Sequence, residues 1–284
     1  MNEHKYYELA CRLRADIQAG RYARDEKLPS ENELTAKTGY SRQTVRQAMS
    51  VLESEGLTVR VQGSGTYVRG DKPQRPLTHN IAVVTTYIGE YIFPAILHGI
   101  DGVLSQNGYT SMLFATHNRV DDERRILTEL LEKPIDGIII EGTKTALPNP
   151  NIALYNRLEA MGVPVIFING FYPEMKEHVY VVADDRAGGR SACDALIAKG
   201  HKRIGGIFKS DDIQGHRRYA GFVEALINGG LEVIDDNIMW YTTENRDALI
   251  ASSAAGILSG CTACVCYNDE VALKVIAALE GAGK

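Results

Sequence analysis

The stretch that decides the N-terminal fold runs from Leu28 to Val68 and reads LPSENELTAKTGYSRQTVRQAMSVLESEGLTVRVQGSGTYV. It predicts two helices joined by a tight turn, then two short β-branched segments around a Gly-Ser-Gly tip. Helix, turn, helix and hairpin in this order are typical of a winged helix-turn-helix. The sequence therefore predicts an α+β head that binds nucleic acid.

The ends of these helices are set by residues that satisfy unpaired backbone groups. Ser30 and Glu33 form a capping box at the start of the first helix. Gly39 ends that helix, because glycine adopts the left-handed backbone at least cost. Ser41 caps the second helix and Gly56 ends it.

The second helix has two chemically different faces. An apolar stripe at helical spacing predicts its buried side, made by Val45, Ala48, Met49 and Leu52. Its opposite, N-terminal face is expected to carry Arg42, Gln43, Thr44 and Arg46. These side-chain types suit base edges and phosphates. The plainer alternative is an ordinary helical hairpin with a solvated polar face.

The hairpin is predicted from Leu57–Val61 and Thr66–Val68, with residues 62–65 (QGSG) as its tip. Glycine lets the backbone approach a groove closely. This tip is the expected wing.

Composition favours local rather than general nucleic-acid contact. The net charge is −5, but residues 1–70 carry 11 basic and nine acidic side chains, whereas the remainder carries 20 and 27. A mildly basic head on an acidic body indicates one DNA-binding region. The opening MNEHKYYELA lacks the apolar core of a signal peptide, and no apolar run reaches about 18 residues. We therefore expect a cytoplasmic protein without membrane contact.

The five cysteines are scattered except for the segment CTACVC at 261–266. That spacing raises a metal site as an alternative, but no histidine or second cysteine pair lies nearby. Cys264 and Cys266 alternate with apolar residues as in a buried strand. No metal and no cofactor are expected.

Residues 70–76 (GDKPQRP) interrupt this pattern with glycine, proline and charge, as in an exposed linker. We assign residues 1–70 to the head, 71–79 to the linker and 80–284 to a second domain. That domain alternates apolar strands with amphipathic helices. Its strands are predicted at 80–85, 109–115, 137–140, 163–168, 203–208 and 264–267, and its helices at 93–106, 121–132, 151–161, 188–199, 217–228 and 269–279.

Continuous apolar strands separated by helices predict an α/β fold with parallel sheets covered on both faces. Ligands of such sheets bind at the carboxyl ends of the strands. The segments that follow the strands are 86–93, 141–144, 169–172, 210–218 and 267–269. They offer carboxylates, amides, arginine and aromatic rings, a mixture that suits a sugar. The alternative is that each is only a polar loop residue.

An enzyme is the least favoured class. The sequence has no G-x-G-x-x-G after the first strand of the second domain, no P-loop and no G-x-S-x-G elbow. Its histidines lack a nucleophile partner.

LPSENEL, SRQTVRQAMSVLESEGL and QGSGTYV resemble the signature of GntR-class bacterial regulators. The resemblance covers residues 1–70 and implies operator contacts from the helix-start loop, the second-helix N-terminus and the wing. The residues carried over are Asn32, Ser41, Arg42, Gln43, Thr44, Arg46, Gln62 and Gly63.

GHKRIGGIFKSDDIQGHRRYAGFVEAL and CYNDEVALKVIAAL resemble the effector domain of the LacI/GalR class, which is related to periplasmic sugar-binding proteins. With TTYIGEYIFPAILHGID and DGIIIEGTK, the whole chain is similar to bacterial repressors of arabinose utilisation. The resemblance implies L-arabinose or a related sugar as effector, bound by Tyr91, Phe93, Glu141, Asn169, Asp184, Asp212, Gln214, Arg218 and Asn268. Gly188-Gly189 is interpreted as a helix-packing pair.

Members of this class continue beyond the helix that ends in ALEGAGK. The second lobe of a two-lobed, periplasmic-binding-protein-like domain is therefore expected to be incomplete, with an exposed sheet edge and exposed apolar surface.

The resulting hypothesis is a homodimeric repressor that holds a palindromic operator and is released by sugar. The alternatives are a repressor of the same architecture for another sugar, and a sugar-binding protein without regulatory DNA binding.

Overall fold

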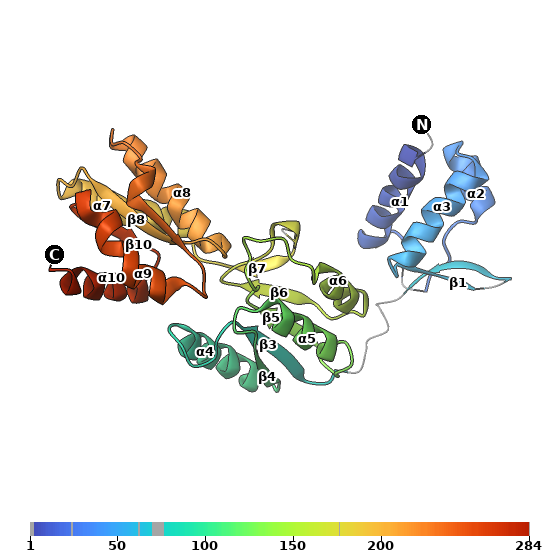
Figure 1. Cartoon of the computed structure of the whole chain (residues 1–284). Helices are drawn as coiled ribbons and strands as arrows, with labels where there is room; N and C mark the ends of the chain where they lie inside the picture. The colour runs from blue at the N-terminus through green and yellow to red at the C-terminus, as the bar shows by residue number, and fades with distance from the viewer. Residues whose placement is uncertain (1–2, 24, 62, 70–76, 176, 284) are drawn as a thin grey trace. The chain divides into compact units, whose positions relative to one another are not determined.

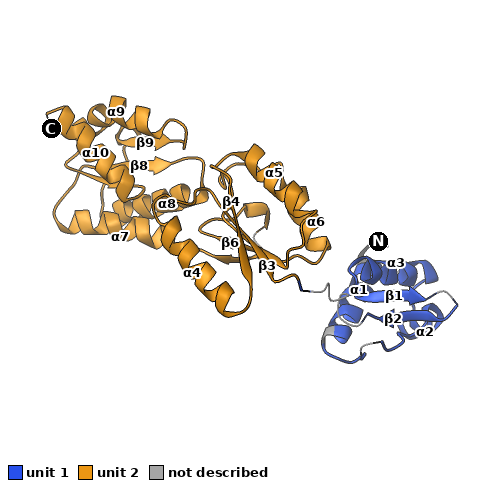
Figure 2. Ribbon diagram, turned by 90° about the horizontal axis from the view of Figure 1, so that it is seen from below, with its two compact units in different colours: residues 1–77 blue, residues 78–284 orange. Residues whose placement is uncertain are grey.

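The computed structural model describes residues 3–283 apart from 24, 62, 70–76 and 176. The chain divides into two compact units, residues 1–77 and 78–284 (Figure 2). Each unit has its own hydrophobic core.

Unit 1 is three helices followed by a hairpin. Its elements are α1 (Glu3–Gln18), α2 (Glu31–Thr38), α3 (Arg42–Ser54), β1 (Thr58–Val61) and β2 (Gly65–Val68). The two strands are antiparallel, with Thr58 opposite Val68 and Val61 opposite Gly65. This is the winged helix-turn-helix that the sequence predicts.

The local signals in unit 1 act as predicted. Ser30 Oγ accepts a hydrogen bond from Glu33 N, and the Glu33 carboxylate accepts one from Ser30 N, so the capping box is complete. Gly39 ends α2 with φ 70°. Leu34 of α2 and the predicted stripe of α3 are buried together against α1. The recognition region therefore rests on a packed three-helix core.

Unit 2 has two lobes, each built on a parallel sheet (Figure 1). Lobe 1 has five strands in the order β4-β3-β5-β6-β7. Its strands are β3 (Asn80–Thr85), β4 (Thr110–Ala115), β5 (Gly137–Ile140), β6 (Val165–Ile168) and β7 (Val179–Val181); its helices are α4 (Phe93–Gln106), α5 (Val120–Leu130) and α6 (Ile152–Ala160), with a 3-10 turn η1 (Pro173–Met175).

Lobe 2 has three parallel strands in the order β10-β8-β9. Its elements are α7 (Asp185–Ala198), β8 (Ile204–Lys209), α8 (Ile213–Asn228), β9 (Ile238–Tyr241), α9 (Arg246–Ile257), β10 (Ala263–Cys266) and α10 (Asp269–Gly281), with 3-10 turns η2 (Asp235–Asn237) and η3 (Leu258–Gly260). Apolar clusters involving α9 and α10, and α7 and α8, pack against the sheet.

Two helices of lobe 2 begin earlier than the sequence pattern predicts. α7 begins at Asp185 rather than Gly188, because the Asp184 carboxylate accepts a hydrogen bond from Ala187 N. α8 begins at Ile213 because Asp212 caps it through Gly215 N. The sequence pattern also misses β7, β9 and α9.

Helices α7 and α8 cross at very short range through two glycines. A Cβ atom on Gly189 would lie 2.0 Å from Arg218 O, and one on Gly221 would lie 1.9 Å from Arg186 O. A Cβ on Gly188 would meet nothing within 4 Å. The predicted packing role therefore belongs to Gly189 and not to Gly188.

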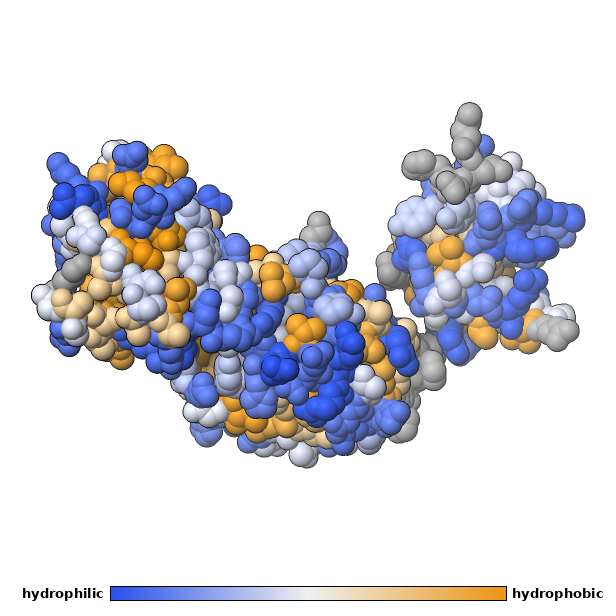
Figure 3. Space-filling view, in the orientation of Figure 1, coloured by the Kyte–Doolittle hydropathy of each residue, from blue (hydrophilic) through white to orange (hydrophobic). Residues whose placement is uncertain are grey.

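β10 lies at one edge of the lobe 2 sheet. On α10, which follows it, Leu273 and Ile276 are 67% and 51% exposed. Figure 3 shows hydrophobic patches on this lobe, mixed with hydrophilic surface. In the described part of the chain, no helix is long and apolar enough to cross a membrane.

Candidate functional site

The start of α3 presents the predicted DNA-binding side chains to solvent. Ser41 is its N-cap, and Arg42 and Gln43 are exposed in its first turn. Arg46 is exposed one turn further on, and Asn32 is exposed in the first turn of α2. Arginine and amide side chains are the groups that donate to phosphates and base edges. These residues form one candidate DNA-binding face, which we call the head face.

Thr44 does not belong to the exposed head face, contrary to the sequence prediction. Its residue is 4% exposed, and its hydroxyl lies 2.8 Å from Ser41 Oγ. The reason is helical spacing, since Thr44 lies four residues before Ala48 and shares its buried stripe.

An acidic residue joins the head face to the hairpin. Glu31 pairs with Arg46 of α3 at 3.1 Å and with Arg60 of β1 at 3.4 Å. The hydrogen bond from Arg46 is the largest effect that lowers the pKa of Glu31. Neither Glu31 nor Arg60 was singled out by the sequence pattern, because the pairing depends on how the hairpin folds back. In the wing, Gly63 has φ 75°, and Gln62 lies outside the described residues.

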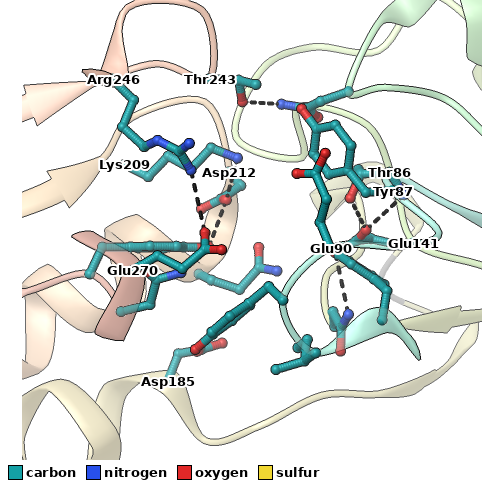
Figure 4. Close-up of a pocket in the computed structure, with 18 of the residues that line it drawn as sticks. Thr86, Tyr87, Glu90, Glu141, Asp185, Lys209, Asp212, Thr243, Arg246 and Glu270 are labelled. Carbon is teal, nitrogen blue, oxygen red and sulfur yellow. Dashed lines mark hydrogen bonds and ion pairs between the residues drawn. The ribbon is translucent and has the colours of Figure 1, made fainter. Parts of the chain in front are cut away.

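The second candidate site is a cavity of about 230 Å³ between the two lobes of unit 2 (Figure 4). Segments that follow the carboxyl ends of all eight parallel strands of unit 2 reach its wall, as the rule for open α/β sheets predicts. The cavity is lined by Thr86, Tyr87, Glu90, Tyr91, Ile92, Phe93, Asn118, Glu141, Gly142, Asn169, Ala183, Asp185, Lys209, Asp212, Gln214, Arg218, Tyr241, Thr243, Arg246, Tyr267, Asn268 and Glu270.

Eight of the nine predicted effector residues line this cavity. They are Tyr91, Phe93, Glu141, Asn169, Asp212, Gln214, Arg218 and Asn268. Asp184 does not line it, and its carboxylate instead caps α7. The neighbouring Asp185 takes the place at the cavity wall. Sequence reasoning also missed Lys209, Tyr241 and Arg246, because it did not weigh the last residue of β8 and did not identify β9.

The lobe 1 wall is centred on a buried carboxylate. Glu141 accepts hydrogen bonds from Thr86 N at 3.0 Å and from Asn169 Nδ2 at 3.3 Å. Burial raises the pKa of Glu141, although the hydrogen bonds from Thr86 and Asn169 oppose this. Tyr91 and Asn169 have positive φ angles of 51° and 60°. Such strained positions persist where the surrounding structure fixes them, often at binding sites.

The lobe 2 wall is a chain of charged pairs. Lys209 Nζ lies 3.0 Å from Asp212 Oδ2, which also accepts from Tyr267 Oη at 2.9 Å. Burial by itself lowers the pKa of Lys209, but the nearby aspartates outweigh it and the pKa is raised. Lys209 therefore stays charged at neutral pH.

Arg218 links three groups of this wall. Its guanidinium pairs with Asp185 Oδ1 at 2.8 Å, donates to the Tyr267 carbonyl, and lies 4.6 Å from the centre of the Tyr267 ring. Burial raises the pKa of Asp185, while the Arg218 charge opposes the shift. The planar guanidinium is thus held with a fixed orientation at the cavity wall.

Gln214 carries an unused acceptor. Its Oε1 is buried and has no hydrogen-bond partner among the described atoms. Buried polar atoms normally have partners, so such an atom calls for an explanation. A hydroxyl group in the adjoining cavity would satisfy it.

The described residues contain no group of three or more His, Cys, Asp or Glu side chains placed to hold a metal ion. Cys264 and Cys266 lie with their sulfurs 3.9 Å apart on β10.

Comparison with known families assigns both units. The family described as "Bacterial regulatory proteins, gntR family" matches residues 5–68. The family described as "Periplasmic binding proteins and sugar binding domain of LacI family" matches residues 78–284.

Two similar proteins carry the name "Arabinose metabolism transcriptional repressor", and each is 38% identical to this chain. The one from Halalkalibacterium halodurans aligns over 96% of this chain and 75% of its own length. The one from Geobacillus stearothermophilus aligns over 98% and 78%.

Solved structures share the fold. The crystal structure of transcription regulator CcpA of Lactococcus lactis has a TM-score of 0.61 and 26% identity, over 72% of this chain and 73% of that one. A complex of transcriptional regulator CelR with cellobiose has a TM-score of 0.63 over 90% and 79% of the two chains, and at 21% identity it supports the fold alone. The chain therefore belongs to the family of arabinose metabolism repressors, transcriptional regulators rather than enzymes, in which a GntR-type head precedes a LacI-type sugar-binding domain.

Proposed function

We infer that this protein is a transcriptional repressor that leaves its operator when L-arabinose or a related sugar fills the cavity of unit 2. The head is residues 1–70, the linker 71–79 and the effector domain 80–284. The observation that carries the proposal is the cavity itself, which gathers charged, amide and aromatic side chains from both lobes. Operator binding places the protein in the cytoplasm.

The cavity chemistry supports a small polyol. Carboxylates at Glu141, Asp185 and Asp212 can accept hydrogen bonds from hydroxyls, and Arg218 can donate them. The ring of Tyr267 can pack on the apolar face of a sugar. A cavity of about 230 Å³ lies below the roughly 300–1,000 Å³ of pockets for drug-sized ligands, which favours a monosaccharide.

The proposed contacts are divided between the two units. In the head, the proposed operator contacts are Asn32, Ser41, Arg42, Gln43, Arg46, Gly63 and, outside the described residues, Gln62. In unit 2, the proposed effector contacts are the eight predicted residues that line the cavity together with Asp185 and Lys209.

A homodimer is proposed because an apolar face of lobe 1 lies uncovered. Val103 of α4 is 62% exposed, and Leu113 of the edge strand β4, which packs beside α4, is 46% exposed. A second copy could cover this face with the same surface, as in a two-fold dimer. Two heads would then match a palindromic operator.

Calorimetric titration with a panel of pentoses and hexoses tests the effector assignment. We expect L-arabinose to bind with the highest affinity of the panel, because the cavity suits one monosaccharide ring and two similar proteins carry the name arabinose metabolism transcriptional repressor. Tighter binding of another sugar would mean that the protein is a repressor of the same architecture with a different inducer. No heat with any sugar would contradict the proposed effector site.

Substitution Arg42→Ala tests the head face. If Arg42 reads a base, its loss should weaken operator binding by about 1–3 kcal/mol and relax specificity at one position. Fluorescence anisotropy at fixed salt, on DNA selected by the protein from a random pool, measures this.

Arg21→Ala is the matched control, because it removes the same charge away from the head face. Arg21 follows α1 and pairs with Asp16 of that helix. A wild-type affinity for Arg42→Ala, or an equal loss in both variants, would rule out base reading by Arg42.

A further inference from the structure

The two lobes of unit 2 also meet at the edge of the cavity, through a polar seam of side chains and backbone amides. Lobe 1 contributes Asn118, which follows β4, together with Thr145. Lobe 2 contributes Asp211, Thr243 and the first amide of α8, at Ile213. We call these five residues the latch. In Figure 4 the bond to Thr243 crosses the top of the cavity.

Asn118 uses both ends of its amide in the latch. Its Nδ2 donates to Thr243 Oγ1 at 2.6 Å and approaches Asp211 Oδ2 at 3.3 Å, so it reaches across to lobe 2. Its Oδ1 accepts from Lys144 N at 3.0 Å within lobe 1. Asn118 is only 2% exposed, so water has little access to these bonds.

Asp211 is the buried acceptor on the other side. It is 2% exposed, and its Oδ2 accepts from Thr243 N at 3.2 Å and from Thr243 Oγ1 at 3.0 Å. Asn118 Nδ2, the Thr243 hydroxyl and Asp211 Oδ2 therefore form a directed chain of hydrogen bonds from lobe 1 into lobe 2. A buried chain of this kind holds one geometry only while every member is present.

Backbone amides report whether the seam is closed. Ile213 N is the first amide of α8, and such amides have no partner inside their own helix. It donates instead to Thr145 Oγ1 across the seam at 3.0 Å, and Ala146 N approaches Asp211 O at 3.5 Å. Separation of the lobes would free both amides.

Strained backbone marks the lobe 1 side of the seam. Asn118 and Lys144 have φ angles of 53° and 48°, in the left-handed region that non-glycine residues rarely adopt. Lys144 also forms an ion pair with Glu244 of lobe 2. Such positions persist only where surrounding contacts fix them. Here those contacts lead into the other lobe.

We propose that Asn118 is a positioning residue that holds lobe 2 against lobe 1 through Thr243 and Asp211, and so sets the fraction of the protein that is ready to bind sugar. Because the cavity walls come from both lobes, only the closed arrangement presents all of them to one ligand. Apparent affinity falls in proportion to the binding-competent fraction. The identity of the sugar in this proposal rests on the proposed function. The contact between the lobes through Asn118 does not depend on which sugar binds.

The sharpest test is Asn118→Asp in the whole chain. Aspartate keeps the tolerance for a left-handed backbone but replaces the donor amide with a carboxylate facing Asp211. Without sugar, we expect hydrogen exchange at the Ile213 and Ala146 amides to rise by roughly tenfold or more. The Kd for L-arabinose should rise by a similar factor.

The double variant Asn118→Asp, Asp211→Asn should restore both readouts in part, because it removes the facing pair of carboxylates and again places an amide opposite a carboxylate across the seam. Recovery is incomplete because Asp211 Oδ2 also accepts from Thr243 N, and an amide nitrogen in that place cannot. A direct sugar contact by Asn118 would not be rescued in this way. Asn228→Asp, the same change at an exposed position at the end of α8, should leave exchange and affinity unchanged.

Thr243→Val is the second variant if Asn118→Asp fails to fold, since it removes only the bridging hydroxyl. It should speed exchange at the same two amides. Unchanged exchange in the folded single variants, or a double variant no closer to wild type than Asn118→Asp, would overturn the proposal. If the wild type binds no sugar, the proposed effector is wrong. The comparison of hydrogen exchange still tests whether the latch holds the two lobes together.

Discussion

Arg218→Ala is expected to abolish the sugar response while leaving operator binding without sugar at the wild-type level. The guanidinium joins Asp185, the Tyr267 carbonyl and the Tyr267 ring at the cavity wall. Its removal deletes a sugar donor and leaves Asp185, which is 4% exposed, without its charged partner. Loss of one member of a buried charge pair at a binding site costs about 2–5 kcal/mol.

Calorimetry with L-arabinose and operator anisotropy with and without sugar measure this effect. Arg218→Lys should recover only part of it, because lysine keeps the charge but not the planar fork. Arg190→Ala is the control, since Arg190 forms exposed pairs with Asp194 and Glu224. An Arg218→Ala protein released normally by sugar would remove Arg218 from the effector site.

Gly221→Ala should destabilise lobe 2 by about 3 kcal/mol or more, at or beyond the upper end of typical overpacking costs. The new Cβ would lie 1.9 Å from Arg186 O and 2.7 Å from Arg190 N, and backbone atoms cannot yield as a flexible side chain can. Helices α7 and α8 would have to separate. Asp185 and Arg218, which lie on these two helices, would separate with them.

Gly188→Ala is the matched control on α7. A Cβ there meets nothing within 4 Å, so alanine should raise stability by roughly 0.5–1 kcal/mol through its better helix propensity. Denaturant unfolding followed by the fluorescence of Trp240, the sole tryptophan, reports lobe 2 directly. Equal midpoints for the two variants would show that the helices do not depend on the close crossing.

Much of the fold was predictable because local signals and burial agree. The capping box at Ser30, the left-handed Gly39 and the stripe of α3 depend on residues close in sequence. In unit 2, β3, α4 and β5 were predicted with the bounds that the structure shows. Continuous apolar strands and amphipathic helices carry that information without knowledge of their neighbours.

Two of the three missed elements lack such signals. β7 has only three residues, all exposed. β9 is apolar and as long as β5, so its sequence does carry a strand signal. In α9, the run Ser252-Ser253 and Gly256 weakens the apolar periodicity.

The cavity was predictable as a region but not in every residue. The rule for strand ends located most of the wall before any contact was known. It did not reach Asp184 or Asp185, because β7, the strand that precedes them, was not predicted. Asp184 was expected only from the family resemblance, and Asp185 lies at the wall instead. Asn118 was missed for a different reason: its role depends on Asp211, which is 93 residues away in sequence. Long-range pairs of this kind have no local pattern.

The central claim is that one chain couples an operator to a sugar, and thermodynamic linkage requires that each weaken the other. The most direct measurement is operator affinity of the whole chain, by fluorescence anisotropy, with and without saturating L-arabinose at one salt concentration. The account predicts weaker operator binding with the sugar, by about 1–3 kcal/mol, and the same factor of weakening for sugar measured on the operator complex. Equal operator affinity with and without a sugar that demonstrably binds would contradict it.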